Sequence, residues 1–374
     1  MVTTERPGGP ATVGGMWRHL QHLPVDDARH VVTLGEGDTP LLPVVGATLG
    51  RIGVGSLHLK AEHQNPTGSF KDRIASVAAT MVVERGLHGA IGTSSGNGGA
   101  AIAAYGARAG FPVVLFTVSG IVDGKLQQIL AQGGHTHIVT GMGEDGASGL
   151  SVAPKIAELA DDRGWLAFLT GARFAPEAMQ GAETIGMELA EQHPGADVVY
   201  APVGGGGLLG SIWRGYHRIG ATPPRLVGVQ PAGCPTLRRA VAGDRTPWAE
   251  PITTSISGLQ VAMLFDHGAI DAVVESGGHV TEVDDEAAWA AQRVLAREEG
   301  LFVEPAGATA LAGLLADVAA GRVGGDDDVV VVTSGAGHKD PTAAARLAEG
   351  NPPHGIGPED IADRVVSLTG GDDA

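Results

Sequence analysis

The sequence predicts an α/β protein in which mostly parallel sheets are covered by helices. Short runs rich in β-branched residues alternate along the chain with longer segments that carry apolar residues at helical spacing. Several of the short runs are almost continuously apolar, which is typical of strands buried on both faces of a parallel sheet. Because ligands bind at the carboxyl ends of strands in such sheets, we expect the functional residues at those ends.

The expected elements follow one another in this alternating pattern. A helix is expected after the turn at residues 65–68, where Ser69 can cap a segment that carries Ile74, Val77 and Met81. Further helices are expected at 100–109, 124–132, 182–192 and 286–299. Strands are expected at 57–62, 113–117, 137–140, 196–201, 225–230 and 328–333.

Composition narrows the class of protein. The chain has 374 residues, enough for two domains, and 25 basic against 42 acidic residues. Since no basic cluster is present to bind a phosphate backbone, we expect no nucleic-acid partner.

The single Cys234 excludes a disulfide framework within the chain and favours a cytoplasmic location. No apolar run reaches the roughly 20 residues of a membrane helix, so no membrane association is expected. Residues 1–15 are rich in Thr, Pro and Gly and are expected to form a disordered tail without a signal peptide.

Lys71 is the most informative single residue. It follows the turn at residues 65–68 and falls in the first turn of the expected helix, among small polar residues that can hold an anion. A lysine in such a place can form a Schiff base with an aldehyde cofactor. The alternative for an isolated lysine is a solvated surface charge, so the choice depends on whether other segments supply a cofactor site.

A glycine-rich loop supplies one such segment. It contains Gly204, Gly205, Gly206 and Gly207, directly after an expected strand and before a helix. Such a loop can wrap a phosphate with its backbone N–H groups, and the helix dipole favours the anion. The loop lacks the Lys-Ser/Thr of a nucleoside-triphosphate site and the distant acidic residue of a dinucleotide site. The alternative is a tight turn between strand and helix.

Two further polar segments come after apolar residues. Thr93, Ser94, Ser95 and Asn97 lie in a run of small residues that precedes a helix, where backbone N–H groups and polar side chains can point at one ligand. Ser334 follows the apolar run at 329–332. Taken singly, the first segment is equally a glycine-rich turn, and the second is a strand that ends in a polar turn.

Together these segments resemble the fold type II pyridoxal-phosphate enzymes, and their threonine synthase branch in particular. The resemblance covers the chain from Trp17 to about Asp340. Its most specific part is Asn-Pro-Thr-Gly-Ser-Phe-Lys-Asp-Arg at residues 65–73, which matches the Schiff-base segment of that branch. Four further segments resemble the corresponding segments of that branch, at residues 16–25, 32–41, 181–188 and 297–306.

The resemblance implies a tryptophan synthase β-like fold of two domains, each with a mostly parallel sheet flanked by helices. A large cofactor domain would comprise residues 16–84 and 176–350. A small mobile domain, residues 85–175, would close on the substrate, and 351–374 would be a tail. A homodimer is implied as well.

The resemblance also assigns roles, with pyridoxal 5′-phosphate as cofactor. It makes Lys71 the Schiff-base lysine and the catalytic acid and base. It implies cofactor contacts from Asn97 to the phenolic oxygen, from Ser334 to the pyridine nitrogen, and from residues 204–207 to the phosphate. The substrate carboxylate would be bound by Thr93, Ser94 and Ser95.

The implied activity is that of a lyase acting on a small amino acid. The lead reaction is threonine synthase-like, from O-phosphohomoserine and water to threonine and phosphate. However, the all-glycine loop and Ser334 resemble serine and threonine dehydratases, so β-elimination to a 2-oxo acid and ammonia is an alternative. A third reading is specialised β-replacement on a non-standard amino acid, and a fourth is a non-catalytic subunit that binds the cofactor.

O-Phosphohomoserine would need a second phosphate site. Its candidate residues are Lys60, Lys125, Arg173 and Lys339, although each is expected to be a surface charge because unpaired basic residues are rarely buried. The 14 His residues form no pair such as His-x-x-x-His on an expected helix, so no metal site is expected.

Overall fold

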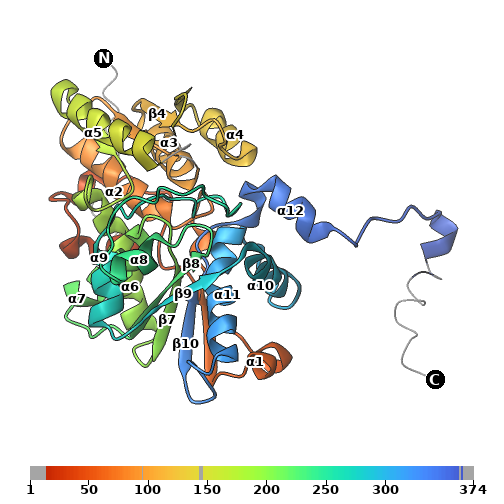
Figure 1. The fold of residues 1–374 in the computed structure, drawn as a ribbon. Coiled ribbons are helices and arrows are strands. Elements are labelled where there is room, and N and C mark those ends of the chain that lie inside the picture. The colour runs from red at the N-terminus through yellow and green to blue at the C-terminus, as the bar shows by residue number, and fades with distance from the viewer. Residues whose placement is uncertain (1–13, 95, 143–145, 362–363, 365–374) are drawn as a thin grey trace, which may run out of the picture.

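The protein has two sheets, each flanked by helices (Figure 1). The computed structural model describes residues 14–94, 96–142, 146–361 and 364. Of the tail expected at residues 1–15, positions 1–13 lie outside the described residues. A 3-10 helix, Gly15–His22, begins at the last residue of that expected tail. The predicted α/β class is confirmed.

The larger sheet has six strands in the order β1-β2-β10-β7-β8-β9. All neighbours are parallel except β1, which pairs antiparallel with β2 at the edge. The strands are β1 Leu41–Pro43, β2 Ser56–Lys60, β7 Val198–Pro202, β8 Arg225–Pro231, β9 Val280–Val283 and β10 Asp328–Val332.

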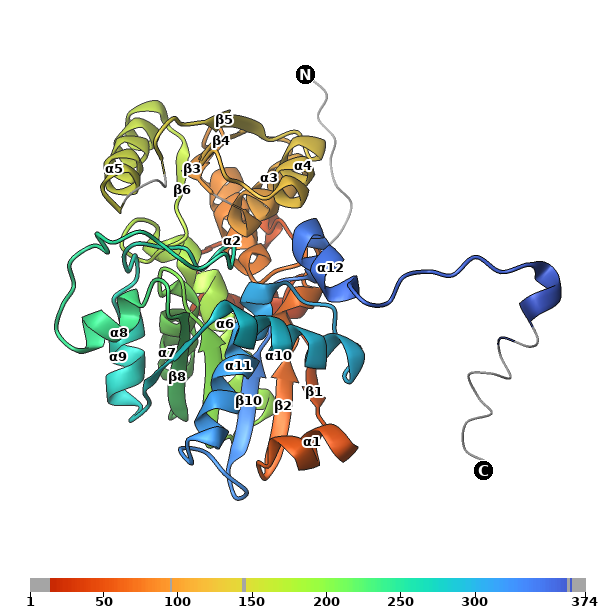
Figure 2. The same cartoon turned by 45° about the vertical axis from the view of Figure 1, so that its right-hand side comes forward.

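The smaller sheet is wholly parallel, in the order β5-β4-β3-β6. Figure 2 shows it above the larger sheet, with its helices beside it. Its elements lie within the range expected for a small domain, whose exact boundaries stay a prediction. They are β3 Ala90–Thr93, α3 Asn97–Ala109, β4 Val113–Thr117, α4 Asp123–Ala131, β5 His135–Ile138, α5 Gly146–Arg163 and β6 Leu166–Phe168.

The remaining helices cover the larger sheet or extend from it. Two separate hydrophobic cores lie against the larger sheet. Helix α11 packs on strands β7, β8, β9 and β10 in one core, whereas α7 and α9 pack on β8 in the other. Beyond α12 the chain runs away from the body of the protein (Figure 1). These helices are α1 Gly46–Ile52, α2 Lys71–Glu84, α6 Pro176–Gln192, α7 Gly207–Arg218, α8 Thr236–Val241, α9 Gly268–Glu275, α10 Asp285–Arg297, α11 Pro305–Ala319 and α12 Pro341–Ala348.

Strand β10 explains why the expected strands are so apolar. Side chains alternate between the two faces of a strand. Val329 and Val331 enter the core beneath α11, while Val330 and Val332 enter the core that contains α2, α6 and α7. All four are fully buried, so a near-continuous apolar run is what a central parallel strand requires.

Four buried charged residues join α2 and α6 to the end of β2 in the larger sheet. Arg73 pairs with Glu62 and with Glu188, each at 2.7 Å, and Lys60 pairs with Glu188 at 2.7 Å. None of these side chains is exposed. Two positive and two negative charges cancel, which makes their burial tolerable, because a buried charge without a partner is strongly destabilising.

Three local expectations are corrected. Ser69 does not cap α2: Phe70 is the N-cap residue, and the Ser69 hydroxyl is buried without a hydrogen-bond partner among the described residues. Asn97 is the first residue of α3 and does not precede the helix. Strand β5 begins at His135, two residues before its expected start. Within the described part of the chain, no helix is both long and apolar enough to cross a membrane.

Candidate active site

A cavity of about 290 Å³ lies where strands β3, β7 and β10 end and helix α2 begins. Every cofactor residue expected from the sequence lines it, as do Thr93 and Ser94. Parallel strands bring their carboxyl ends to one edge of a sheet, which is why segments far apart in the sequence meet here. Ser95 lies outside the described residues.

The segment that carries Lys71 is held by the loop after β10. The Phe70 N–H donates to the Ser334 carbonyl at 3.2 Å, and the Ala336 N–H donates to the Gly68 carbonyl at 2.9 Å. Within the segment itself, the Thr67 N–H and hydroxyl both donate to the Asp72 carboxylate at 3.0 Å. Lys71 is thereby fixed at the first turn of α2, next to the residue expected at the cofactor's ring nitrogen.

The environment of Lys71 favours the neutral amine. Burial lowers the pKa of Lys71 to about 8. The Phe70 ring, whose centre lies 4.3 Å from Nζ, attracts the cation and does not reverse this shift. A neutral amine is the nucleophilic and basic form of lysine. At neutral pH, Lys71 is therefore far closer to its reactive form than an exposed lysine.

The glycine cup, defined as residues 204–207, begins one residue beyond the end of β7. Gly206 has a φ of +91°, and a Cβ there would lie 2.6 Å from the Asp266 carbonyl oxygen. A Cβ on Gly204 would lie 2.8 Å from the Gly258 carbonyl oxygen. Only glycine fits both positions without a shift. Helix α7 begins at Gly207, so its first N–H groups have no partner within the helix and remain available to an anion.

Asn97 connects the smaller sheet to two charged residues. Its Nδ2 donates to Glu304 Oε1 at 2.6 Å, and Glu304 Oε2 lies 3.0 Å from Lys125 Nζ. Lys125 also donates to the Ser257 hydroxyl at 3.1 Å. The Asn97 Oδ1 atom is buried and has no hydrogen-bond partner among the described residues. An unsatisfied buried amide at a cavity wall is a contact available to a ligand.

Ser94 already has local partners. Its Oγ accepts hydrogen bonds from the N–H groups of Gly96 at 3.2 Å and Gly99 at 2.6 Å, at the start of α3. The hydroxyl therefore helps to order the helix N-terminus. The role of Thr93, Ser94 and Ser95 toward a substrate carboxylate stays a prediction.

These features suit a ligand that carries an aldehyde and a phosphate. Lys71 supplies an amine with a lowered pKa, and the glycine cup leads into the N-terminus of α7, where backbone N–H groups can bind an anion. Asn97 supplies an unused polar atom. The residues present thus fit pyridoxal phosphate.

Comparison with known proteins agrees with this chemistry. Residues 32–335 match the family described as pyridoxal-phosphate dependent enzyme. The chain belongs to this family. The threonine synthase of Methanocaldococcus jannaschii is 35% identical over 90% of this chain and 83% of the relative. That of Mycobacterium tuberculosis is 34% identical over 93% of this chain and 94% of the relative.

Solved structures extend the comparison to the fold. The crystal structure of the T.th. threonine deaminase has a TM-score of 0.66 and 25% identity, and covers 85% of this chain and 94% of its own. The fold type II prediction is confirmed, and the protein is a pyridoxal-phosphate-dependent enzyme of the threonine synthase and dehydratase group. The role of each site residue stays a prediction.

The four basic candidates for a second phosphate site are not alike. Lys60, Lys125 and Lys339 are buried, so the expectation of surface charges is wrong for these three. Lys60 is used in the ion pair with Glu188, and Lys339 donates to the Thr67 carbonyl at 2.6 Å. Lys125 lines the cavity, whereas Arg173 is absent from the described lining. Only Lys125 and Lys71 bring a basic side chain to that lining.

Glu304 is a site residue that the sequence did not reveal. It precedes Pro305, the first residue of α11, and this position at a helix start is visible in the sequence. What the sequence does not show is that β10 and the loop around Gly335 place Glu304 beside Asn97. The Glu304 N–H donates to the Gly335 carbonyl at 2.9 Å.

Proposed function

We propose that this enzyme converts O-phosphohomoserine and water to threonine and phosphate. One observation carries the proposal: the cavity presents two separate places for an anion, the glycine cup and the ammonium group of Lys125. A cofactor phosphate at the cup leaves Lys125 for the phosphate of the substrate. The similarity to curated threonine synthases over most of the chain supports the same substrate.

The residues divide the work between binding and proton transfer. Bound at this site, pyridoxal phosphate supplies an electron sink for bonds that break at the amino-acid Cα. The neutral amine of Lys71 takes the proton from Cα and returns protons later, as a general base and acid whose pKa is near the operating pH. Asn97 would contact the cofactor, with its free Oδ1 accepting from a donor there, and the N–H groups of the glycine cup would hold the phosphate.

A second candidate is β-elimination from serine or threonine to a 2-oxo acid and ammonia. Lys125 is already paired with Glu304 at 3.0 Å, so its charge is partly neutralised, and a dehydratase needs no second phosphate site. The likeness to the threonine deaminase structure fits this alternative.

Product analysis separates the two reactions. The purified holoenzyme is supplied with O-phosphohomoserine, threonine or serine, while inorganic phosphate and 2-oxo acids are measured. We expect phosphate and threonine from O-phosphohomoserine and little 2-oxo acid from the other two. The reverse pattern would replace the lead function with the dehydratase. Lys71→Ala serves as the inactive control, and turnover by this variant at the wild-type rate would refute the mechanism itself.

Lys125→Gln tests the substrate contact. We expect a higher KM for O-phosphohomoserine because the variant loses the cation, and an unchanged affinity for pyridoxal phosphate. An unchanged KM would place the substrate phosphate elsewhere.

We further propose that the enzyme is a cytoplasmic homodimer. Support comes from the resemblance to fold type II enzymes and from the single, buried Cys234. Light scattering after size-exclusion chromatography tests the dimer, and a molar mass near the 37.9 kDa of one chain would exclude it.

A further inference from the structure

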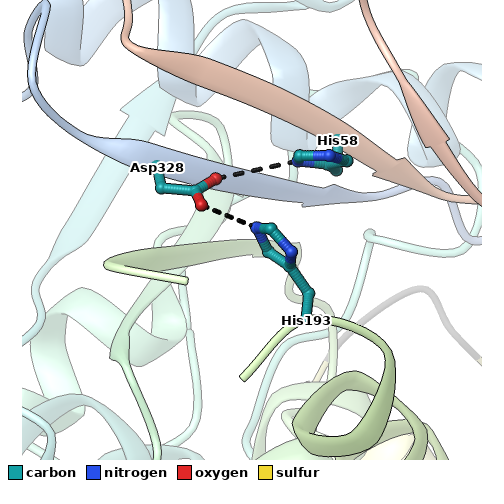
Figure 3. Close-up of side chains that lie close together, drawn as sticks. All are labelled: His58, His193 and Asp328. Atoms are coloured by element: carbon teal, nitrogen blue, oxygen red, sulfur yellow. Dashed lines mark hydrogen bonds and ion pairs between the residues drawn. The ribbon is translucent and has the colours of Figure 1, made fainter. Parts of the chain in front are cut away.

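Two imidazoles and one carboxylate meet at the end of the larger sheet opposite the cavity. His58 lies on β2, His193 is the C-cap residue of α6, and Asp328 is the first residue of β10 (Figure 3). The cavity adjoins the carboxyl end of β10, whereas Asp328 opens its amino end. The cluster is therefore separate from the residues that bind cofactor.

The three side chains face a common point. His193 Nε2 lies 2.8 Å from Asp328 Oδ2, and His58 Nδ1 lies 3.7 Å from Asp328 Oδ1. The centres of the two imidazole rings are 4.3 Å apart. One ligand atom from each residue lies within 4.8 Å of the other two.

The hydrogen bonds leave one buried ligand atom of the cluster without a partner among the described residues. Asp328 Oδ1 accepts from the Ser56 hydroxyl, and Oδ2 is hydrogen-bonded to His193. His58 Nδ1 is buried and has no hydrogen-bond partner among the described residues. At 3.7 Å from Oδ1 it is too far for a hydrogen bond, yet it points to the same place as the other two groups. A buried nitrogen lone pair beside a carboxylate suits a cation between them.

The donor set identifies the kind of cation. Two imidazole nitrogens and one carboxylate oxygen are ligands that zinc and similar divalent transition ions prefer, while Mg²⁺ and Ca²⁺ take oxygen ligands. Zinc bonds of about 2.0–2.2 Å place tetrahedral ligands roughly 3.4 Å apart. The 2.8 Å pair of His193 and Asp328 would therefore open slightly, and the 3.7 Å pair of His58 and Asp328 would close slightly.

Neighbouring groups hold Asp328 in place. Besides the Ser56 hydroxyl on its Oδ1, the backbone N–H of Asp328 donates to Asp197 Oδ2 at 2.8 Å. Hydrogen bonds of this kind orient metal ligands and keep them near their bound geometry.

We propose that His58, His193 and Asp328 form a structural site for a divalent transition-metal ion of the zinc type. Water completes the four-coordinate shell. The ion ties β2, the end of α6 and the start of β10 together, joining residues that are at least 135 positions apart in the chain. Because it binds the folded state and not the separated ligands, it stabilises the larger sheet. The inference does not depend on the reaction proposed above.

The test uses the full-length holoenzyme without a histidine tag, treated with chelator and titrated with Zn²⁺. We expect one equivalent to bind per chain by calorimetry and metal analysis, and the thermal midpoint to rise on binding. Co²⁺ in place of Zn²⁺ should give the visible absorption of a tetrahedral ion.

Matched variants locate the ion. His58→Gln and His193→Gln should each weaken binding by about 100-fold or more, since loss of an outer-shell partner alone costs 10–100-fold. His279→Gln is the control, because His279 also pairs with a carboxylate, Asp317 at 2.6 Å, but belongs to no three-ligand group among the described residues. It should leave Zn²⁺ binding unchanged.

Two outcomes would overturn the proposal. One is a wild-type enzyme without saturable Zn²⁺ binding, a result that needs no variant and indicates an ordinary hydrogen-bonded cluster. The other is tight binding that survives in His58→Gln and His193→Gln. Circular dichroism and cofactor content establish that each variant is folded.

Discussion

The substitution Gly206→Ala tests whether the glycine cup holds the cofactor phosphate. The residue has a φ of +91°, where an L-amino acid costs about 1–2 kcal/mol. The new Cβ would also lie 2.6 Å from the Asp266 carbonyl oxygen and 3.0 Å from Ala269 Cβ. Such overpacking adds about 1–3 kcal/mol. The free energy of unfolding should therefore fall by about 2–5 kcal/mol in total.

Part of this strain should appear in cofactor binding. The N–H groups of Phe265 and Asp266 donate to the Gly205 carbonyl at 2.9 and 3.0 Å, so a displacement of Asp266 moves the cup itself. If about 1.4 kcal/mol is lost from the bound state, the Kd for pyridoxal phosphate rises about tenfold. The assay is titration of the apoenzyme with the cofactor, followed by its visible absorbance.

Gly220→Ala is the matched control. Gly220 lies just beyond the other end of α7 and has a φ of +73°, but a Cβ there would meet nothing within 4 Å. It should show the backbone cost alone, about 1–2 kcal/mol, and bind the cofactor like the wild type. The reasoning would be refuted if folded Gly206→Ala bound the cofactor as tightly as Gly220→Ala. Gly204→Ala, without a positive φ, gives a second test should Gly206→Ala fail to fold.

Three other predictions concern charge and packing. With a pKa of about 8, half of Lys71 is neutral at pH 8. The rate of cofactor attachment to the apoenzyme should therefore rise with pH, with a midpoint near 8. A midpoint near 10.5 would contradict the lowered pKa of Lys71. Glu188→Gln leaves excess buried positive charge and should cost about 3–5 kcal/mol in urea unfolding, while the exposed Glu191→Gln should cost less than about 1. Gly215→Ala would place a Cβ 2.0 Å from the Glu183 carbonyl oxygen and should force α6 and α7 apart, lowering the thermal midpoint; an unchanged midpoint would mean that the helices adjust freely.

The sign of the Lys71 effect on stability follows from the same pKa. The folded apoenzyme holds this lysine at about 8, below the 10.5 of an unperturbed lysine. Between these values the unfolded chain binds more protons, so this residue makes the apoenzyme more stable as pH rises through that window.

Local patterns predicted much of the fold. Five of the six strands that pair on both sides were predicted within about two residues, because their apolar, β-branched runs are bounded by turns; they are β2, β4, β7, β8 and β10. The sixth, β3, was not predicted as a strand. Short edge elements such as β1 and β6, three residues each, were not predicted, since so few residues carry no periodicity. Ser69 was expected to cap α2 from its residue type alone. In the structure the bridge from Ser69 to Gly335 places it beside the loop after β10, and Phe70 occupies the cap.

The candidate site shows the same division between local and distant information. Lys71 and the glycine cup are recognisable because each lies within one continuous segment whose chemistry needs specific residue types. The burial of Lys60 was not predictable, because its charge is neutralised by Glu188, which is 128 positions away.

The sequence by itself determined the α/β class and the cofactor family, and it singled out Lys71 and the glycine cup, since spacing within a segment encodes them. Only the tertiary structure decided which charges share a wall of the cavity. The order of parallel strands brings Asn97, Glu304 and Lys125 together at one edge of the sheets. At the opposite end of β10 it likewise gathers His58, His193 and Asp328. Strand order follows from the packing of whole helices and sheets, and no short stretch of sequence records it.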